Sequence, residues 1–259
     1  MTIGDIHIYE YALPFQKPIT MMRQQLSERR GLVLSIKNKD SCEGLGEIAP
    51  FPGLSKESML QAKNQLLKLI PAILKKDISL FGDVKSISAK VSLPSVRFGI
   101  ESAICDLWAK SQHVQVAQLF TKKPLEKIKI NALFADANDI AYKTKQIAAD
   151  NFSAIKIKVG RGDIDQEIEM VQSVRKNAGR DISIRLDANC AWTLNEAIRF
   201  ARGVQDCDIE YIEEPLLHTH QLKDFIAETG LPVALDESLT PETANDPPDG
   251  VVAFIIKPG

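Results

Sequence analysis

Residues 154–159 read Ala-Ile-Lys-Ile-Lys-Val, an apolar stretch that carries a lysine at every second position in its middle. Alternation with a period of two is typical of a β-strand, and it places Lys156 and Lys158 on the same face of that strand. A short apolar stretch followed by a helical pattern predicts a strand of a parallel sheet. The same unit recurs on both sides of residues 154–159, and this recurrence decides the predicted fold.

Short apolar stretches alternate with amphipathic helical segments from about residue 127 onward. The predicted strands are residues 128–133, 154–159, 182–187, 209–213, 233–236 and 252–257, and the predicted helices between them are residues 139–149, 165–177, 193–204 and 221–229. This alternation predicts parallel strands with right-handed crossovers, in an open doubly wound sheet or a (β/α) barrel. No G-x-G-x-x-G or G-x-x-x-x-G-K-[ST] follows a strand, which argues against a nucleotide-binding sheet.

The first 125 residues follow a different order. Strand-like stretches at 6–11 and 32–36 come first, and helical patterns begin near Ser55 and Pro94. Strands followed by helices predict an α+β domain. We therefore predict an α+β capping domain at residues 1–125 and a (β/α) TIM-type barrel domain at residues 126–259. With six strands of the usual eight, the barrel is expected to be incomplete at its C-terminus.

Composition excludes several classes of protein. The 259 residues are 44% hydrophobic and 25% charged, with a net charge of −2, so the basic excess of a nucleic-acid-binding protein is absent. The longest purely apolar run, residues 251–256, is far shorter than the roughly 20 residues of a membrane span. The N-terminus does not resemble a signal peptide, and the four cysteines form no C-x-x-C. We expect a cytoplasmic protein that binds a small molecule and has no nucleic-acid or membrane partner; its oligomeric state is left open.

Five successive strands of the barrel region carry charged residues at their carboxyl ends, where a buried strand should be apolar. These residues are Lys156 and Lys158, then Asp187, Glu213, Asp236 and Lys257. In a parallel barrel these ends converge on one mouth, where active sites lie. A salt bridge or a surface charge would explain each residue singly. The whole set favours a metal site with cationic acid–base groups, because buried charges need a partner or a metal.

The acids in this set indicate the kind of metal. Three carboxylates without a thiolate or an imidazole favour a hard cation such as Mg²⁺, with Mn²⁺ as an alternative. Two lysines two residues apart beside such a cation are expected to have a lowered pKa, and a neutral lysine is a competent general base. Arg185 and Asn189 share a strand face with Asp187 and would lie beside it.

Taken together, the motifs resemble those of the enolase superfamily. They are Ile-Lys-Ile-Lys-Val-Gly (155–160), Arg-Leu-Asp-Ala-Asn-Cys-Ala-Trp (185–192), Ile-Glu-Glu-Pro (212–215), Leu-Asp-Glu-Ser (235–238) and Ile-Lys-Pro (256–258). The K-x-K and D-x-N-x-x-W patterns resemble the muconate-lactonizing subgroup. The Glu-Glu-Pro motif and the segments at 46–55 and 95–103 are similar to those of the o-succinylbenzoate synthases within it.

The resemblance implies roles for individual residues. Its metal ligands would be Asp187, Glu213 and Asp236, its catalytic residues Lys158, Lys257 and Lys156, and its site-lining residues Arg185 and Asn189. Lys158 would remove the proton alpha to the substrate carboxylate. Lys257 would face it as a second acid–base group or as a cation that stabilises the enediolate. Glu214 would lie behind the ligands at most.

The implied reaction is the magnesium-dependent dehydration of 2-succinyl-6-hydroxy-2,4-cyclohexadiene-1-carboxylate to o-succinylbenzoate in menaquinone biosynthesis. An N-acylamino-acid racemase, a dipeptide epimerase or a muconate cycloisomerase would use the same site, and the motifs do not separate them. A non-catalytic binding protein is a further alternative, against which the intact lysines and acids argue. Specificity is expected from two cap loops, residues 16–30 (with Met21, Met22, Arg23 and Arg29) and residues 49–55.

Overall fold

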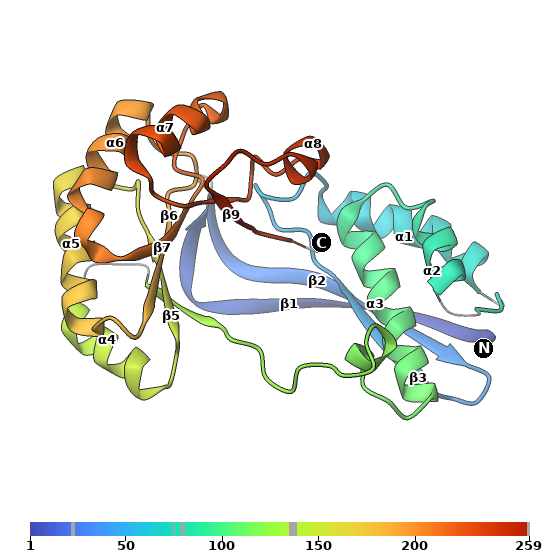
Figure 1. Ribbon diagram of the computed structural model, residues 1–259. Helices are drawn as coiled ribbons and strands as arrows, with labels where there is room; N and C mark the ends of the chain where they lie inside the picture. The colour runs from blue at the N-terminus through green and yellow to red at the C-terminus, as the bar shows by residue number, and fades with distance from the viewer. Residues whose placement is uncertain (22–23, 75, 79–80, 135–138, 258–259) are drawn as a thin grey trace. The chain divides into compact units, whose positions relative to one another are not determined.

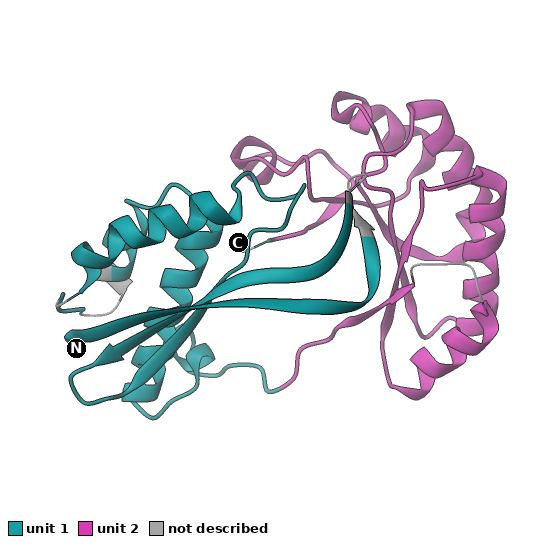
Figure 2. Ribbon diagram, turned by 180° about the vertical axis from the view of Figure 1, so that it is seen from behind, with its two compact units in different colours: residues 1–126, 257–259 teal, residues 127–256 magenta. Residues whose placement is uncertain are grey.

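A computed structural model of the chain describes residues 1–21, 24–74, 76–78, 81–134 and 139–257 (Figure 1). The chain divides into two compact units, each with a hydrophobic core of its own. Unit 1 comprises Met1–Glu126 and the last residues from Lys257, and unit 2 comprises Lys127–Ile256 (Figure 2). The division falls after Glu126, where the sequence analysis placed it after residue 125.

Unit 1 combines an antiparallel sheet with helices, in the order β1-β2-β3 within the sheet. Its elements are β1 (Ile3–Met21), β2 (Gln24–Asn38), β3 (Glu43–Ile48), α1 (Met59–Ile73), α2 (Phe81–Ser88), α3 (Pro94–Ser111) and the 3-10 helix η1 (Val116–Leu119). Strand alternation buries Leu32, Leu34 and Ile36 in a core shared with the helices. At Gly46 a Cβ atom would lie 1.9 Å from the carbonyl oxygen of Gly99, so the close packing of α3 on β3 requires glycine there.

The segment 16–30 is a strand pair, and the prediction of a loop there is wrong. Its described residues belong to β1 and β2, which pair in antiparallel register as far as Ile19 with Leu26 and Met21 with Gln24. The register shifts between Pro14 and Ile19, and the pairing resumes beyond that irregularity. The sequence signal is weak because the shift interrupts the alternation of polar and apolar residues. Met22 and Arg23 lie outside the described residues.

Unit 2 is a parallel α/β structure, as predicted. Its strands are β4 (Asn131–Phe134), β5 (Ala154–Lys158), β6 (Ser183–Asp187), β7 (Ile209–Glu213), β8 (Val233–Leu235) and β9 (Val251–Phe254). Its helices are α4 (Ile140–Ala149), α5 (Ile164–Ala178), α6 (Leu194–Gly203), α7 (Leu222–Thr229) and α8 (Pro241–Asn245), with 3-10 helices η2 (Gln205–Cys207) and η3 (Thr219–Gln221). The six strands are neighbours in chain order, and every pairing is parallel.

The two faces of this sheet differ sharply. Helices α4 to α7 lie along one side of the strands (Figure 1), and residues such as Ile157, Leu186 and Ile212 are buried in the core with them. Because successive side chains of a strand point to opposite faces, the residues between them in sequence face the other way. That second face carries charged side chains, among them Lys156, Asp187 and Glu213.

Strand β9 ends earlier than predicted, at Phe254 rather than Lys257. Its neighbour β8 ends at Leu235, whose carbonyl accepts the N–H of Ile255 at 2.8 Å. Because β8 ends at Leu235, the pairing of β9 with β8 does not continue past this bond. Lys257 therefore lies after the strand and not at its end.

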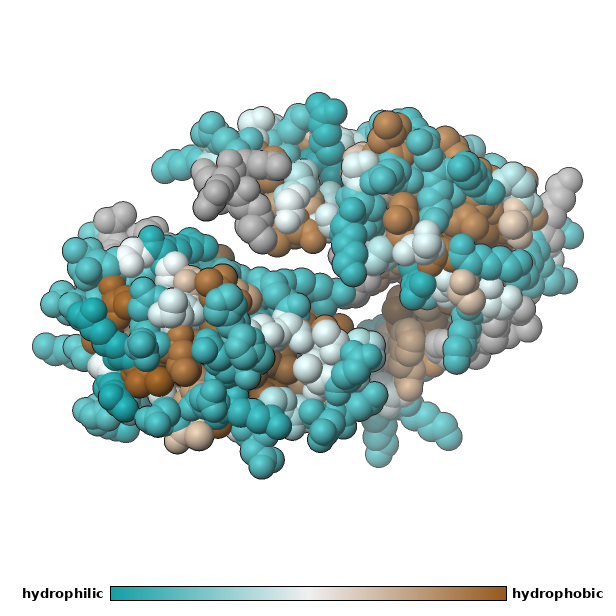
Figure 3. All heavy atoms as spheres, turned by 90° about the horizontal axis from the view of Figure 1, so that it is seen from above, coloured by the Kyte–Doolittle hydropathy of each residue, from teal (hydrophilic) through white to brown (hydrophobic). Residues whose placement is uncertain are grey.

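None of the helices among the described residues is long and apolar enough to cross a membrane. Hydrophilic residues cover most of the face drawn in Figure 3, with hydrophobic residues scattered among them. Scattered apolar residues are usual on a protein surface.

Candidate active site

Three predicted site residues stand side by side at the carboxyl ends of neighbouring strands. Lys158 of β5 is in register with Asp187 of β6, and Asp187 is in register with Glu213 of β7. Paired strands lie about 4.8 Å apart, so the three side chains leave one face of the sheet at the same level. The register therefore brings together the base predicted from the sequence and two predicted metal ligands.

Both lysines of β5 direct their ammonium groups to these carboxylates. Lys156 Nζ lies 2.8 Å from Asp187 Oδ2 and 2.7 Å from Glu213 Oε2. Lys158 Nζ donates a hydrogen bond to the same Asp187 oxygen and another to Asn189 Oδ1, at 2.7 Å. Asp187 and Glu213 are each 1% exposed. The ammonium groups thus compensate carboxylates that water scarcely reaches.

These ion pairs decide the pKa of two groups. Burial lowers the pKa of Lys156, but hydrogen bonds and attraction to Asp187 and Glu213 outweigh burial, so its pKa lies above the ordinary value. Burial likewise opposes ionisation of Asp187, yet its hydrogen bonds from both lysines hold the pKa of that carboxyl below its usual value. Carboxylates dominate the surroundings of Lys156 here; the lowered lysine pKa expected beside a bound cation stays a prediction.

Asp236 approaches the cluster from the end of β8. It directly follows that strand, is half-buried, and its side chain shares a hydrogen bond with Glu213. Burial raises the pKa of Glu213, the hydrogen bond from Lys156 lowers it, and repulsion by Asp187 and the bond with Asp236 raise it, to about 7. Two carboxyl groups that share a hydrogen bond need either a proton or a cation between them.

The donor set fits the predicted cation. Carboxylate oxygens are the ligands that Mg²⁺ prefers. One oxygen of Asp187 and one of Glu213 already bind a positive charge, the ammonium group of Lys156. Among the described residues, the three predicted ligands do not all bring an oxygen within 4.8 Å of one another. Cation binding at this place therefore requires the ammonium group to move aside.

Asn189 and Arg185, the two predicted site-lining residues, differ in position. Asn189 accepts a hydrogen bond from Lys158 and donates one to Glu237 Oε1 at 3.1 Å, so it belongs to the cluster. Arg185 lies one level deeper in the sheet, where its Nε donates to Glu210 at 2.8 Å and its guanidinium lies 5.4 Å from the centre of the Tyr211 ring. Arg185 thus contacts the strand residues below the carboxylates.

Lys257 follows β9 by three residues and is exposed. It groups with unit 1, whereas the carboxylates belong to unit 2. Its predicted catalytic role stays a prediction.

Glu214 is the site residue whose part the sequence reasoning understated. It is 2% exposed, and its Oε1 accepts hydrogen bonds from Asp236 N at 2.7 Å, Ser238 N at 2.8 Å and Ser238 Oγ at 2.6 Å. The available signal was the Glu-Glu pair itself: in an extended strand the two side chains would face opposite ways, which predicts partners for the second glutamate other than those of Glu213.

A second group of ligand-type atoms, from Cys190, Glu214 and Glu237, lies within 4.8 Å of one another. Burial, reinforced by Glu214 and other carboxylates, raises the pKa of the Cys190 thiol to about 12. The thiol is therefore protonated near neutral pH, and its Sγ donates to Glu214 Oε2 at 3.6 Å. In this structure hydrogen bonds join the group: the one from Cys190 to Glu214, and the one from Asn189 to Glu237 at 3.1 Å.

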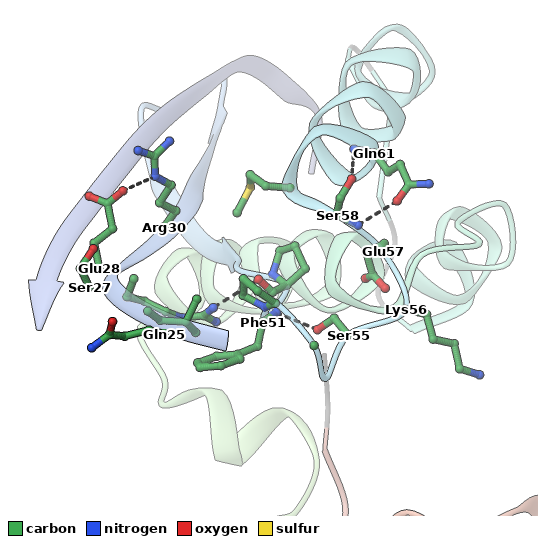
Figure 4. A pocket seen from close by; sticks show the side chains of 16 residues that line it. Gln25, Ser27, Glu28, Arg30, Phe51, Ser55, Lys56, Glu57, Ser58 and Gln61 are labelled. Atoms are coloured by element: carbon green, nitrogen blue, oxygen red, sulfur yellow. Dashed lines mark hydrogen bonds and ion pairs between the residues drawn. The ribbon is translucent and has the colours of Figure 1, made fainter. Parts of the chain in front are cut away.

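In unit 1, a cavity of about 570 Å³ lies between β2 and the residues from Pro50 to Gln61 (Figure 4). Arg29 joins its two sides: its guanidinium donates to the carbonyl oxygens of Ala49 and Pro50 and lies 4.8 Å from the centre of the Phe51 ring. Both cap segments that the sequence analysis named for specificity are thus connected through one side chain. Whether they select the substrate stays a prediction.

Two parts of the chain match known protein families. Residues 139–243 match the family model described as "Enolase C-terminal domain-like", and residues 3–107 match "MenC, N-terminal domain". The o-succinylbenzoate synthase of Aliivibrio salmonicida is 30% identical over 259 residues, which cover 97% of this chain and 72% of that protein. The chain belongs to the enolase superfamily. The predicted likeness to its o-succinylbenzoate synthases is confirmed.

Other similar proteins differ in length or in activity. "Protein PHYLLO, chloroplastic" of Arabidopsis thaliana is 31% identical over 99% of this chain, but the chain spans 17% of that protein. Among solved structures, the dipeptide epimerase from Methylococcus capsulatus complexed with Mg and the dipeptide L-Arg-D-Lys has a TM-score of 0.82 and 22% identity, covering 98% of this chain and 74% of that one. The predicted α/β barrel fold is thereby confirmed.

Proposed function

We propose that this protein is a magnesium-dependent dehydratase, a carbon–oxygen lyase that converts 2-succinyl-6-hydroxy-2,4-cyclohexadiene-1-carboxylate to o-succinylbenzoate in the cytoplasm. The observation that carries the proposal is the alignment of Lys158, Asp187 and Glu213 on three adjacent strands. The similarity to o-succinylbenzoate synthases over nearly the whole chain supports the choice of reaction. A lysine base with a magnesium-stabilised enediolate is the general pattern of the superfamily and is carried over from it.

In this proposal Asp187, Glu213 and Asp236 hold the cation. A divalent cation bound to the substrate carboxylate would stabilise the negative charge that develops there when the alpha proton leaves. Asp187 and Glu213 suit this task because they are buried, and interactions between charges are stronger where water is excluded.

Lys158 would act as the base. Its Nζ is held by Asp187 and by Asn189, so the ammonium group has a defined position at the carboxyl end of β5. In its neutral form it would accept the alpha proton, and as an ammonium group it would return a proton to the departing hydroxide, which leaves as water. Lys156, whose ammonium group pairs with the two carboxylates in this structure, would move aside for the cation, and Lys257 is proposed as the second cationic group.

The decisive experiment is incubation of the protein and Mg²⁺ with the cyclohexadiene precursor while the absorbance of the aromatic product is followed. We expect product formation that EDTA abolishes and Mg²⁺ restores. A variant without the proposed base, Lys158→Ala, is the matched control for background aromatisation. Absence of turnover under these conditions would refute the proposed reaction.

An epimerase or racemase is the second candidate, favoured by the fold shared with the dipeptide epimerase from Methylococcus capsulatus. Both reactions begin with removal of an alpha proton, so the same lysine and carboxylates would serve. A panel of N-succinyl amino acids and dipeptides in deuterated water separates them. Deuterium incorporation at the alpha carbon without dehydration of the cyclohexadiene would support the second candidate.

A further inference from the structure

Glu214 connects two turns at the carboxyl ends of the strands. Its side chain accepts three hydrogen bonds from the turn after β8, two of them from the backbone N–H groups of Asp236 and Ser238. Its carbonyl oxygen accepts the N–H of Cys190, in the turn after β6, at 2.8 Å. Its other carboxylate oxygen accepts from the Cys190 thiol. A single residue thus bonds to the turn that carries Asn189 and to the turn that carries Asp236.

The backbone of Glu214 is also unusual. Its φ angle is +43°, in the left-handed region that non-glycine residues rarely occupy. Such a conformation costs free energy and persists where the surrounding bonds determine it. Glu214 is 2% exposed, and its carboxylate accepts hydrogen bonds from neutral donors. The bonds it makes are all directed to the two turns.

We propose that Glu214 is a positioning residue: its carboxylate holds the turn after β8 so that Asp236 presents its side chain to Glu213 and to the cation. This inference rests on the proposed function, in which Asp236 is a metal ligand. A carboxylate can accept several hydrogen bonds at once, and bonds to a charged acceptor are strong, which makes glutamate suited to this place. Partners behind metal ligands commonly change metal affinity about 10- to 100-fold when they are removed.

Glu167 offers a matched control within the same unit. It is also buried, and it accepts three backbone hydrogen bonds, from Gly160, Arg161 and Gly162. The turn that it holds follows β5 and contains none of the three proposed ligands. Removal of the Glu167 carboxylate leaves three donors without a partner, and removal of the Glu214 carboxylate leaves the three of the turn after β8 and the weakly donating Cys190 thiol, so a similar loss of stability is expected. The two glutamates differ in that Glu214 bonds to Asp236, whereas the bonds of Glu167 go to the turn after β5.

The test is a calorimetric titration of the protein with Mn²⁺, together with a thermal unfolding measurement for each variant. Asp236→Ala serves as the reference for loss of a ligand. For Glu214→Ala we expect metal affinity to fall about 10- to 100-fold. We expect Glu167→Ala to lower the unfolding temperature comparably and to leave metal affinity unchanged. Glu214→Gln keeps the size of the side chain and one acceptor oxygen, and it is expected to keep most of the affinity.

Ser238→Ala provides a milder variant if Glu214→Ala does not fold. It removes one of the three donors, so we expect a smaller loss of metal affinity, about two- to tenfold. Weakened binding in Asp236→Ala with unchanged binding in Glu214→Ala and Ser238→Ala would overturn the positioning role and leave the proposed function intact. An equal loss in Glu167→Ala would overturn it as well. Unchanged binding in Asp236→Ala would overturn both the positioning role and the proposed metal site.

Discussion

Asp187 receives both lysines of β5 on a single oxygen, and it is the carboxylate on which the proposed site depends most. In Asp187→Asn one oxygen and the negative charge are lost, while the size of the side chain is kept. We expect the affinity for Mn²⁺ to fall at least about tenfold, because a ligand is removed rather than a residue behind one. Titration calorimetry measures this change. Asp165→Asn is the control, since Asp165 pairs with Arg199 on the surface of the helices, and a comparable loss there would contradict the assignment.

Lys158 is the second residue whose role can be tested singly. If it is the base, Lys158→Ala should lower kcat about 10²- to 10⁴-fold, the usual contribution of a positioned acid–base group. Metal binding should persist, because the variant removes a positive charge beside Asp187 and keeps all three carboxylates. Steady-state kinetics and a Mn²⁺ titration check the two halves of this prediction. Lys176→Ala, on the exposed side of α5, should leave kcat unchanged; a kcat within tenfold of the parent in Lys158→Ala would exclude the base role.

Alternation along strands predicted the neighbourhood of Lys158, Asp187 and Asn189, because the direction of a side chain on a strand follows from its position alone. The partners of Arg185 were not predictable in this way. Its bond to Glu210 depends on a shift in register between β6 and β7, which no property of either strand reveals. The bonds of Glu214 to the turn after β8 likewise join residues 22 and 24 positions apart, and turn geometry rather than periodicity brings them together.

Helix α3 shows how one buried carboxylate supports an element. Its N-cap residue, Leu93, has no side chain that can accept a hydrogen bond, so the first N–H groups of the helix need another acceptor. Glu57 supplies it, accepting from Ser95 N at 2.9 Å and Ser95 Oγ at 2.6 Å. Burial works against ionisation of Glu57, but the bonds from Ser95 prevail and hold its pKa below the usual value. The carboxylate also carries the charge that a helix N-terminus favours.

A pH dependence of stability follows from that lowered pKa. The charged form is stabilised in the folded state, so its contribution is present above the unfolded pKa of about 4.3 and is lost as the pH falls through the lower folded pKa. We expect Glu57→Gln to lower the free energy of unfolding by about 1–2 kcal/mol at pH 7, as loss of a helix cap does. The difference from the parent should shrink below pH 4. Urea unfolding at several pH values measures it, and a difference independent of pH would contradict the prediction. Glu228→Gln, an exposed partner of Arg202, should change stability little.

The predicted strands and helices of unit 2 were found, but in both units the ends of some elements differ from the prediction. The helical pattern near Ser55 begins at Met59, with Ser58 as the N-cap in a capping box with Gln61, because the Ser55 hydroxyl accepts the N–H of Phe51 instead. Residues 128–130, Ile-Lys-Ile, precede β4 although they alternate like a strand, since β5 begins opposite Asn131. In each case a competing hydrogen bond or the extent of a neighbouring strand decided the end, and neither is visible in local sequence.

At the scale of the whole molecule, the two units have separate hydrophobic cores, and the chain has two tryptophans, one in each. Trp108 packs against the core of unit 1, and Trp192 is 4% exposed in the core of unit 2. Phenylalanine in place of either leaves a single fluorescent reporter for the other unit. Unfolding that proceeds unit by unit would not follow a two-state scheme, and the two reporters would then record different transitions.

Cation binding should therefore stabilise one unit and not the other. All three proposed ligands belong to unit 2, and a ligand that binds the folded form stabilises it by about 2.7 kcal/mol at 100 times its Kd. With saturating Mn²⁺, we expect the transition of Trp108→Phe, reported by Trp192, to move to higher temperature, while that of Trp192→Phe, reported by Trp108, stays in place. Adding Asp187→Asn to Trp108→Phe should abolish the shift and so excludes a general effect of the salt. Equal shifts in both reporters would mean that the units unfold together, and no shift in either would contradict a cation site at the ends of β6, β7 and β8.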